Sequence, residues 1–229
     1  VSLDQAHHLR VNDRIQLFNN TYGAILYLAV AGGFTVTEVL GSTSTDTANG
    51  LGGLNGLPLA SQDILKGSKF NMPRRMRSIP EGLSSRGYFS KNATVHVISG
   101  PEAYLFTKEV IDNFYSHAFL LSAEISRVGY RLTGHPIHAD SYNIPSKTVL
   151  PGTIQIPPSG DPIILMVDGP VTGGYPRMGV VAKVDQPILA QLRSGGRVRF
   201  LACLPEEART REANQRQWIE ELYHKKTER

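Results

Sequence analysis

A tyrosine held between glycines and a proline is the chain's most unusual chemical feature. It stands in the segment Thr172-Gly173-Gly174-Tyr175-Pro176, shortly after an apolar run that ends in Asp168. Paired glycines let the backbone approach a ligand closely, and a tyrosine so fixed could aim its hydroxyl. A carboxylate that leaves an apolar strand needs a partner, so Asp168 and Tyr175 are predicted to be catalytic. The alternative is a tight loop in which Asp168 caps backbone N–H groups and Tyr175 fills a gap. The residues predicted to contact the substrate here are Thr172, Gly173 and Gly174.

Two further segments could bind a carbonyl or carboxylate group. Gln155 lies in Thr153-Ile154-Gln155-Ile156, out of phase with the isoleucines, so its amide faces the other side of the predicted strand. Arg131 follows Tyr130, and its guanidinium fork matches the geometry of a carboxylate. We predict that Gln155 is catalytic and that Tyr130 and Arg131 bind substrate. The alternatives are a solvent-facing strand glutamine and a structural ion pair.

Other familiar types of site are not predicted. His135 and His138 could bind a metal ion, but no third ligand follows at a useful spacing. The glycine-rich segment 50–56 lacks the Lys-Ser/Thr ending of a phosphate-binding loop. The single cysteine, Cys203, has apolar neighbours that indicate a buried, inert thiol. We therefore expect this chain to bind no metal and no cofactor of its own.

Composition is that of a soluble globular protein. The chain has 229 residues, 41% hydrophobic and 19% charged, with a formal net charge of +4. Its best basic cluster, residues 72–77, is interpreted as a solvated loop, so no nucleic-acid partner is expected. The longest apolar stretch, Ala24 to Ala31, is too short to cross a bilayer, and no secretory signal is present. These features predict a cytoplasmic protein without a membrane partner.

The elements that must position these residues are mostly short strands. Fourteen prolines and 22 glycines suit many strands joined by turns, and indicate a sandwich or barrel. Strands are predicted at residues 14–18, 25–30, 94–98, 153–156, 163–167, 179–184 and 197–201. Helices are predicted at residues 102–115, 187–192 and 205–226, the last of them pinned to the surface by its final third.

Taken together, these segments resemble a known family. The matching motifs include Tyr27 to Gly33, Gly129 to Gly134, Pro151 to Pro157 and Asp168 to Pro176. Their order and spacing agree from about residue 9 to residue 203. The chain resembles the second subunit of allophanate hydrolase and the C-type subunit of 5-oxoprolinase, a carboxyltransferase-type family that includes a branch antagonising a kinase inhibitor. The glycine-rich segment that usually opens the family pattern does not precede Val1, so the resemblance implies N-terminal truncation.

The resemblance implies a mainly β fold: cyclophilin-like β-barrels with a few short helices and a C-terminal helix. It places the remainder of an N-terminal β-barrel lobe at residues 1–68, a connection at 69–92 and a C-terminal barrel with its terminal helix at 93–229. It also implies a partner that is either the B-type subunit of 5-oxoprolinase or the first subunit of allophanate hydrolase. ATP used by the complex, and a small-molecule substrate whose lactam or amide bond is cleaved, are implied as well.

Departures from the family pattern leave other functions open. Relatives commonly carry Arg in place of Ile25 and Thr43, and Asp in place of Ser126, while the segment Gly169-Pro170-Val171 replaces a more polar loop. Losing charged and amide groups weakens carboxylate binding, so a non-catalytic subunit that binds a kinase-inhibitor-like partner is the main alternative. The carboxyltransferase part of a biotin-dependent urea carboxylase is another. Prolyl isomerase activity is a weaker one, because no matching set of residues is present.

Overall fold

The computed structural model describes residues 5–18, 23–69 and 90–224. The chain divides into two compact units, one of residues 1–15 and 26–83 and the other of residues 16–25 and 84–229. Most of the predicted connection at 69–92, together with the basic cluster at 72–77, lies outside the described residues.

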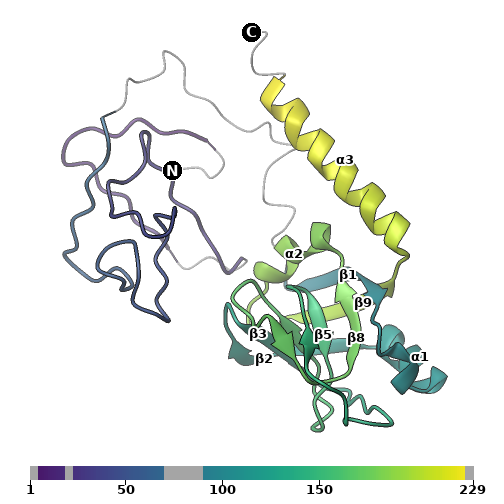
Figure 1. Cartoon of the computed structure of the whole chain (residues 1–229). Helices are drawn as coiled ribbons and strands as arrows, with labels where there is room; N and C mark the ends of the chain where they lie inside the picture. The colour runs from purple at the N-terminus through teal and green to yellow at the C-terminus, as the bar shows by residue number, and fades with distance from the viewer. Residues whose placement is uncertain (1–4, 19–22, 70–89, 225–229) are drawn as a thin grey trace. The chain divides into compact units, whose positions relative to one another are not determined.

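The second unit is built on a closed β-barrel with strand order β1-β8-β5-β6-β3-β2-β9 (Figure 1). All neighbours pair antiparallel except β1 and β9, which run parallel. Two further short strands, β4 and β7, form a separate ribbon. The predicted mainly β barrel with few helices is thus confirmed. The strand bounds are β1 Asn92–Ser99, β2 Ala118–Ile125, β3 Gly129–Thr133, β4 Lys147–Thr148, β5 Thr153–Gln155, β6 Ile163–Leu165, β7 Thr172–Gly173, β8 Arg177–Val181 and β9 Arg197–Ala202.

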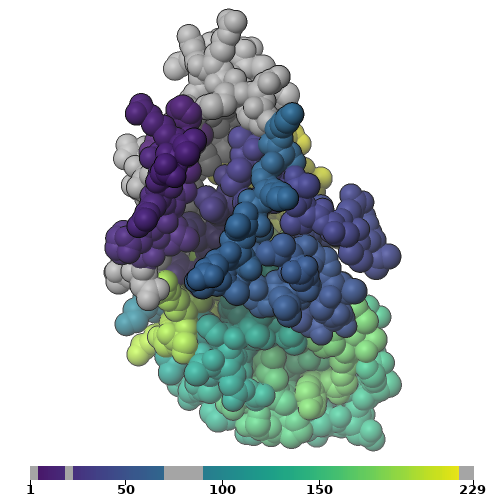
Figure 2. All heavy atoms as spheres, turned by 90° about the vertical axis from the view of Figure 1, so that its left-hand side faces the viewer, coloured from purple at the N-terminus to yellow at the C-terminus, as the bar shows by residue number. Residues whose placement is uncertain are grey.

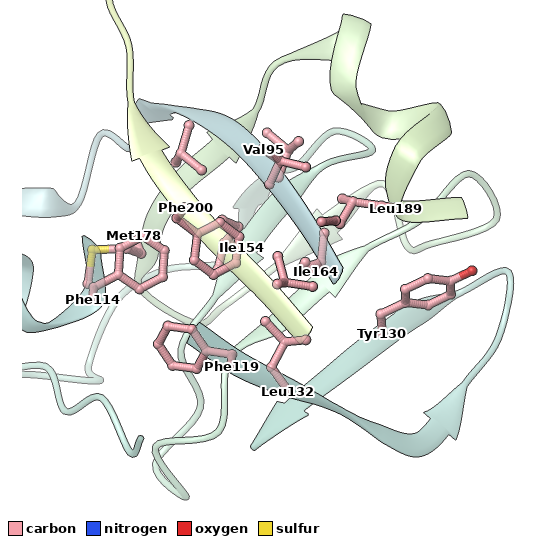
Figure 3. Packing of buried hydrophobic residues seen from close by; sticks show 14 of the residues in the cluster. Val95, Phe114, Phe119, Tyr130, Leu132, Ile154, Ile164, Met178, Leu189 and Phe200 are labelled. Carbon is pink, nitrogen blue, oxygen red and sulfur yellow. The ribbon is translucent and has the colours of Figure 1, made fainter. Parts of the chain in front are cut away.

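Alternating apolar residues fill the barrel. In β1, Ala93, Val95 and Val97 are buried, while the residues between them are exposed or half-buried. In β9, Val198 and Phe200 point inward by the same alternation. Figure 3 shows Val95 and Phe200 among residues of other strands and of two helices that belong to the same buried cluster. Around the barrel, teal and green in Figure 2, the atoms form a continuous surface on the side shown.

Helix α1, Lys108–Ser116, packs one face against this core. Thr107 caps it by accepting a hydrogen bond from the Val110 N–H at 3.3 Å. The helix predicted at 102–115 therefore begins later, after the 3₁₀ turn η3, Ala103–Leu105. Phe114 is fully buried, and its ring stacks on Phe200 with centroids 4.5 Å apart.

Helix α3, Pro205–His224, docks on the barrel through its first half (Figure 1). Ala208 is buried, and Arg211 bonds Asp185, the last residue of the 3₁₀ turn η4, Lys183–Asp185. Trp218 and Ile219 are exposed, so the prediction that the final third pins the helix is wrong for these residues. The helix is anchored nearer its start than predicted, by the ion pair between Arg211 and the buried Asp185 carboxylate. The short helix α2, Gln186–Ala190, agrees with the helix predicted at 187–192.

The first unit has little regular structure in its described residues. It contains isolated bridges between Phe34 and Gly67, Val39 and Ser42, and Asp46 and Leu51. The strands predicted at 14–18 and 25–30 are not formed in the part of the chain that the structure describes. A strand needs a neighbour for its backbone groups, and here the Ile25 N–H donates instead to the Gln191 side chain at 3.1 Å, within the second unit.

No helix among the described residues is both long enough and apolar enough to span a bilayer.

Candidate functional site

The candidate site centres on Gln155, the last residue of β5. Its side chain is buried, with 5% of the residue exposed, although strand alternation allowed it to face solvent. Its Nε2 is buried and has no hydrogen-bond partner among the described residues. An unpaired buried donor costs about 1–3 kcal/mol, so an incoming acceptor at this amide would recover that free energy.

Gly173 in β7 is what leaves space for this amide. A Cβ atom built on Gly173 would lie 2.2 Å from Gln155 Nε2, far inside van der Waals contact. Any larger residue at 173 must displace the amide or the β4–β7 ribbon. The structure thus brings together two of the residues that sequence analysis placed at a site, from segments that are separate in the chain.

Beside Gln155 lies a buried charge cluster that sequence analysis did not identify. Glu102, with 1% of the residue exposed, accepts hydrogen bonds from Arg177 Nε at 2.5 Å and Nη2 at 2.6 Å. Lys147 Nζ donates to the same carboxylate at 3.1 Å. Arg177 is the β8 partner of Gln155, at a point where the β5–β8 register is irregular, so the cluster lies beside the end of β5 that carries Gln155. The three charged residues are far apart in the chain, and no short motif links them.

The cluster also holds the ribbon in place. Arg177 Nη1 donates to the Thr148 carbonyl oxygen at 2.8 Å, and Lys147 pairs with Gly173 across the ribbon. Hydrogen bonds from Arg177, opposed by burial and assisted by Lys147, lower the pKa of Glu102. Glu102 is therefore a charged anchor at neutral pH, and it fixes the segment that lies against Gln155.

Asp168, predicted to be catalytic, occupies an exposed ion pair. It accepts hydrogen bonds from Arg127 Nε at 2.5 Å and Nη2 at 3.0 Å, and both side chains are about half exposed or more. The alternative interpretation expected the Asp168 carboxylate to accept hydrogen bonds from backbone N–H groups, but its partner is the Arg127 guanidinium. The Asp168 N–H donates to the Arg127 carbonyl oxygen at 2.9 Å. Its catalytic role stays a prediction.

Replacing Asp168 by asparagine is expected to change the free energy of unfolding by less than about 1 kcal/mol, because exposed ion pairs contribute little. Urea denaturation of the two proteins would measure this. A loss several times larger would mean that the Arg127–Asp168 pair organises the loop.

Arg131, Tyr130 and Tyr175, which were also predicted to belong to the site, have different environments. Arg131 Nε donates to Glu124 at 2.7 Å, which is the ion pair that sequence analysis kept as an alternative. Tyr130 is buried at the edge of the core, with its hydroxyl directed away from the other labelled side chains in Figure 3. Burial raises the pKa of the Tyr130 hydroxyl. Tyr175 is exposed. Their roles at a site stay predictions.

A second polar cluster lies on the outside of β1. Asp185, also buried, accepts hydrogen bonds from the His96 N–H at 2.7 Å, from His96 Nδ1 at 2.8 Å and from both terminal nitrogens of Arg211. Burial opposes ionisation, but these hydrogen bonds outweigh it and lower the pKa of Asp185. Cys203 is half-buried, whereas the sequence predicted a buried thiol. Desolvation, and to a smaller extent the nearby charge of Glu207, raises the pKa of this thiol, as expected of an unreactive cysteine.

No group of metal-ligating side chains comes together among the described residues. The rings of His117 and His135 lie near each other, with centroids 4.2 Å apart, but they do not gain a third ligand in the part of the chain that the structure describes.

Comparison with known proteins identifies a family model and related subunits that match most of the chain. Residues 1–202 match the family model described as carboxyltransferase domain, subdomain A and B. The chain is 34% identical over 215 residues to the C-type subunit of 5-oxoprolinase from Escherichia coli, covering 93% of this chain and 67% of that protein. It is 29% identical to the corresponding 5-oxoprolinase subunit of Haemophilus influenzae, covering 91% of this chain and 66% of that one. The chain thus spans about two thirds of these relatives.

Among solved structures, the urea carboxylase of Kluyveromyces lactis is similar with a TM-score of 0.72 and 26% identity. The match covers 84% of this chain and 19% of that protein. The family match, for its part, extends through the last strand of the barrel and includes the segments around Gln155 and Gly173.

Proposed function

Because the chain belongs to the family of the carboxyltransferase domain, subdomain A and B, we propose that it is a subunit of a 5-oxoprolinase-type complex that cleaves a lactam or amide bond together with a related partner. In this proposal Gln155 supplies a hydrogen-bond donor to the carbonyl oxygen of the substrate. The complex requires ATP, and this chain binds none of its own. The partner is of the type of the 5-oxoprolinase B-type subunit or the first allophanate hydrolase subunit.

One observation carries the proposal. The Gln155 amide is buried and unpaired among the described residues, and the lack of a side chain at Gly173 lets the β7 backbone lie directly against it. Buried polar groups are nearly always hydrogen-bonded, so an orphan donor of this kind is expected where a ligand completes it. A donor aimed at a carbonyl oxygen stabilises the charge that develops there during attack on an amide. The 34% identity to a 5-oxoprolinase subunit supports a lactam as that amide.

The test is reconstitution of the complex. Co-expression with the products of neighbouring genes should give ATP-dependent release of glutamate from 5-oxoproline, and omission of this chain should abolish it. The Gln155→Leu variant is expected to lower turnover by about 100-fold or more, the typical effect of removing one donor to a developing oxyanion. Unchanged turnover by this variant would reject the role of Gln155.

The Gln155→Leu variant is expected to lose turnover without losing stability. Leucine has nearly the same size as glutamine and removes the unpaired donor, so Gln155→Leu is expected to leave the free energy of unfolding unchanged or to raise it. Urea denaturation of the isolated chain would measure this, with Gln217→Leu on the exposed face of α3 as the matched control. A large loss of stability would mean that Gln155 is a structural residue.

A binding subunit without its own active site is the second candidate, and the ion pairs favour it. Asp168 is engaged by Arg127 and Arg131 by Glu124, so two charged groups predicted for the site are already paired. In this alternative the chain captures a kinase-inhibitor-like partner. A tight complex with that partner, without turnover of 5-oxoproline under any condition, would favour it over the hydrolase.

A further inference from the structure

The β-sheet register places Lys147 and Gln155 on the same side of the β4–β7 ribbon. Lys147 lies directly opposite Gly173 in that antiparallel pair. Opposite residues share a face, with Cβ positions about 5 Å apart. A Cβ atom built on Gly173 would lie 2.2 Å from Gln155 Nε2, so Lys147 and this amide are on the same side of the ribbon. The Lys147 Cβ therefore lies within about 7 Å of Gln155 Nε2.

The charges around this position do not cancel. Glu102 is one carboxylate between two cations, Arg177 and Lys147. Arg177 uses its donors on Glu102 and on the Thr148 carbonyl oxygen, and only 14% of its side chain is exposed. Lys147 donates to Glu102 through one hydrogen bond, and 47% of its side chain is exposed. The cluster therefore keeps one excess positive charge, and Lys147 is the cation that can present it to a ligand.

We infer that Lys147 is a specificity-determining residue of the Gln155 site: it binds an anionic group of the ligand whose carbonyl oxygen accepts a hydrogen bond from Gln155. This inference rests on the proposed function and adds a residue to the same site. An ammonium group binds a carboxylate through charge-assisted hydrogen bonds, which are stronger than the neutral bond made by the amide. Lys147 thus selects ligands that carry an anionic group as well as the carbonyl over neutral amides.

Entry of the ligand requires the ribbon to yield. A carbonyl oxygen at hydrogen-bond distance from Gln155 Nε2 needs about 3 Å, which the backbone of Gly173 partly occupies. The ribbon lies outside the barrel sheet and is short: β4 and β7 pair through Lys147–Gly173 and Thr148–Thr172, and the Val149 N–H donates to the Val171 carbonyl oxygen at 3.0 Å. Because Glu102 and Arg177 hold β4, the shift that admits the ligand is one of Gly173 and β7.

Calorimetric titration of the full chain with two probes tests this assignment. The probes are 5-oxoproline and 2-pyrrolidinone, which has the same lactam ring without the carboxylate. Wild type is expected to bind 5-oxoproline at least about tenfold more tightly than 2-pyrrolidinone, and less so as salt is added. Lys147→Met should remove that preference by weakening 5-oxoproline alone, and Lys147→Arg should largely restore it. Lys108→Met, at an exposed lysine on α1, is the matched control and should bind like wild type.

Each contrary outcome has a separate meaning. No binding of 5-oxoproline by wild type, an unchanged preference in Lys147→Met, or an equal loss for both probes would overturn the assignment; an equal loss marks a structural lysine. A complex that fails to open the lactam, although the chain shows the expected preference, would reject the proposed reaction and leave Lys147 assigned. Turnover that keeps its KM in Lys147→Met would reject the assignment alone.

Discussion

Replacing Glu102 by leucine is expected to lower the free energy of unfolding by about 3–5 kcal/mol, more than any other single change at the candidate site. Glu102 is buried and is the common acceptor for Arg177 and Lys147. Its removal leaves the Arg177 guanidinium, itself mostly buried, without a counter-charge. Breaking one side of a buried ion pair is costly because the remaining charge must be neutralised or rehydrated. Urea denaturation monitored by circular dichroism would measure the loss.

A double substitution separates the buried charge from the packing. In Glu102→Leu/Arg177→Met both partners become apolar, and a well-packed apolar pair is often as stable as the ion pair it replaces. We therefore expect the double variant to recover most of the lost stability. Glu102→Gln should be intermediate, because the amide oxygen still accepts a hydrogen bond but the charge is gone. A double variant no more stable than Glu102→Leu would show that the network is needed for the fold itself.

The barrel could be predicted because its strands carry their own signal. Val95 and Val97 alternate with polar residues in β1, and Ile163 to Leu165 form an apolar run that becomes β6. Both patterns reflect which strand faces are buried, and in a closed barrel every strand buries its inward face. The strands at 118–125 and 129–133 were not predicted as strands, since the apolar residues of β2 do not alternate cleanly before its irregular register.

The candidate site was only partly predictable. Gln155 and Gly173 could be predicted because each has a local signal. Gln155 is an amide between two isoleucines of a predicted strand, and Gly173 belongs to a pair of glycines. Glu102 did not, because it was interpreted as the start of a helix and nothing nearby indicates its burial. Its partner Arg177 is on β8, and only the antiparallel β5–β8 register brings that strand beside Gln155. Long-range pairing of this kind depends on topology, which spacing along a single chain does not contain.

Lowering the pH below about 4 is expected to destabilise the protein through Asp185 as well as Glu102. The pKa of each carboxyl is lowered in the folded state. Their stabilising contributions are therefore complete above the unfolded values of about 4, and are lost as the pH falls through the lower folded pKa. Asp185→Asn should flatten the stability profile in this range. It should also cost about 2–3 kcal/mol at pH 7, less than Glu102→Leu, because its partners His96 and Arg211 are about one third exposed and can be rehydrated.

A matched control and a second signal make this acid transition specific to Asp185. Asp112→Asn, in an exposed pair with Lys108, should keep the wild-type profile below pH 4. Since Asp185 joins β1 to the first half of α3, the transition should include loss of helical signal from that helix. An Asp185→Asn profile as steep as that of wild type would assign the acid sensitivity to other carboxyl groups.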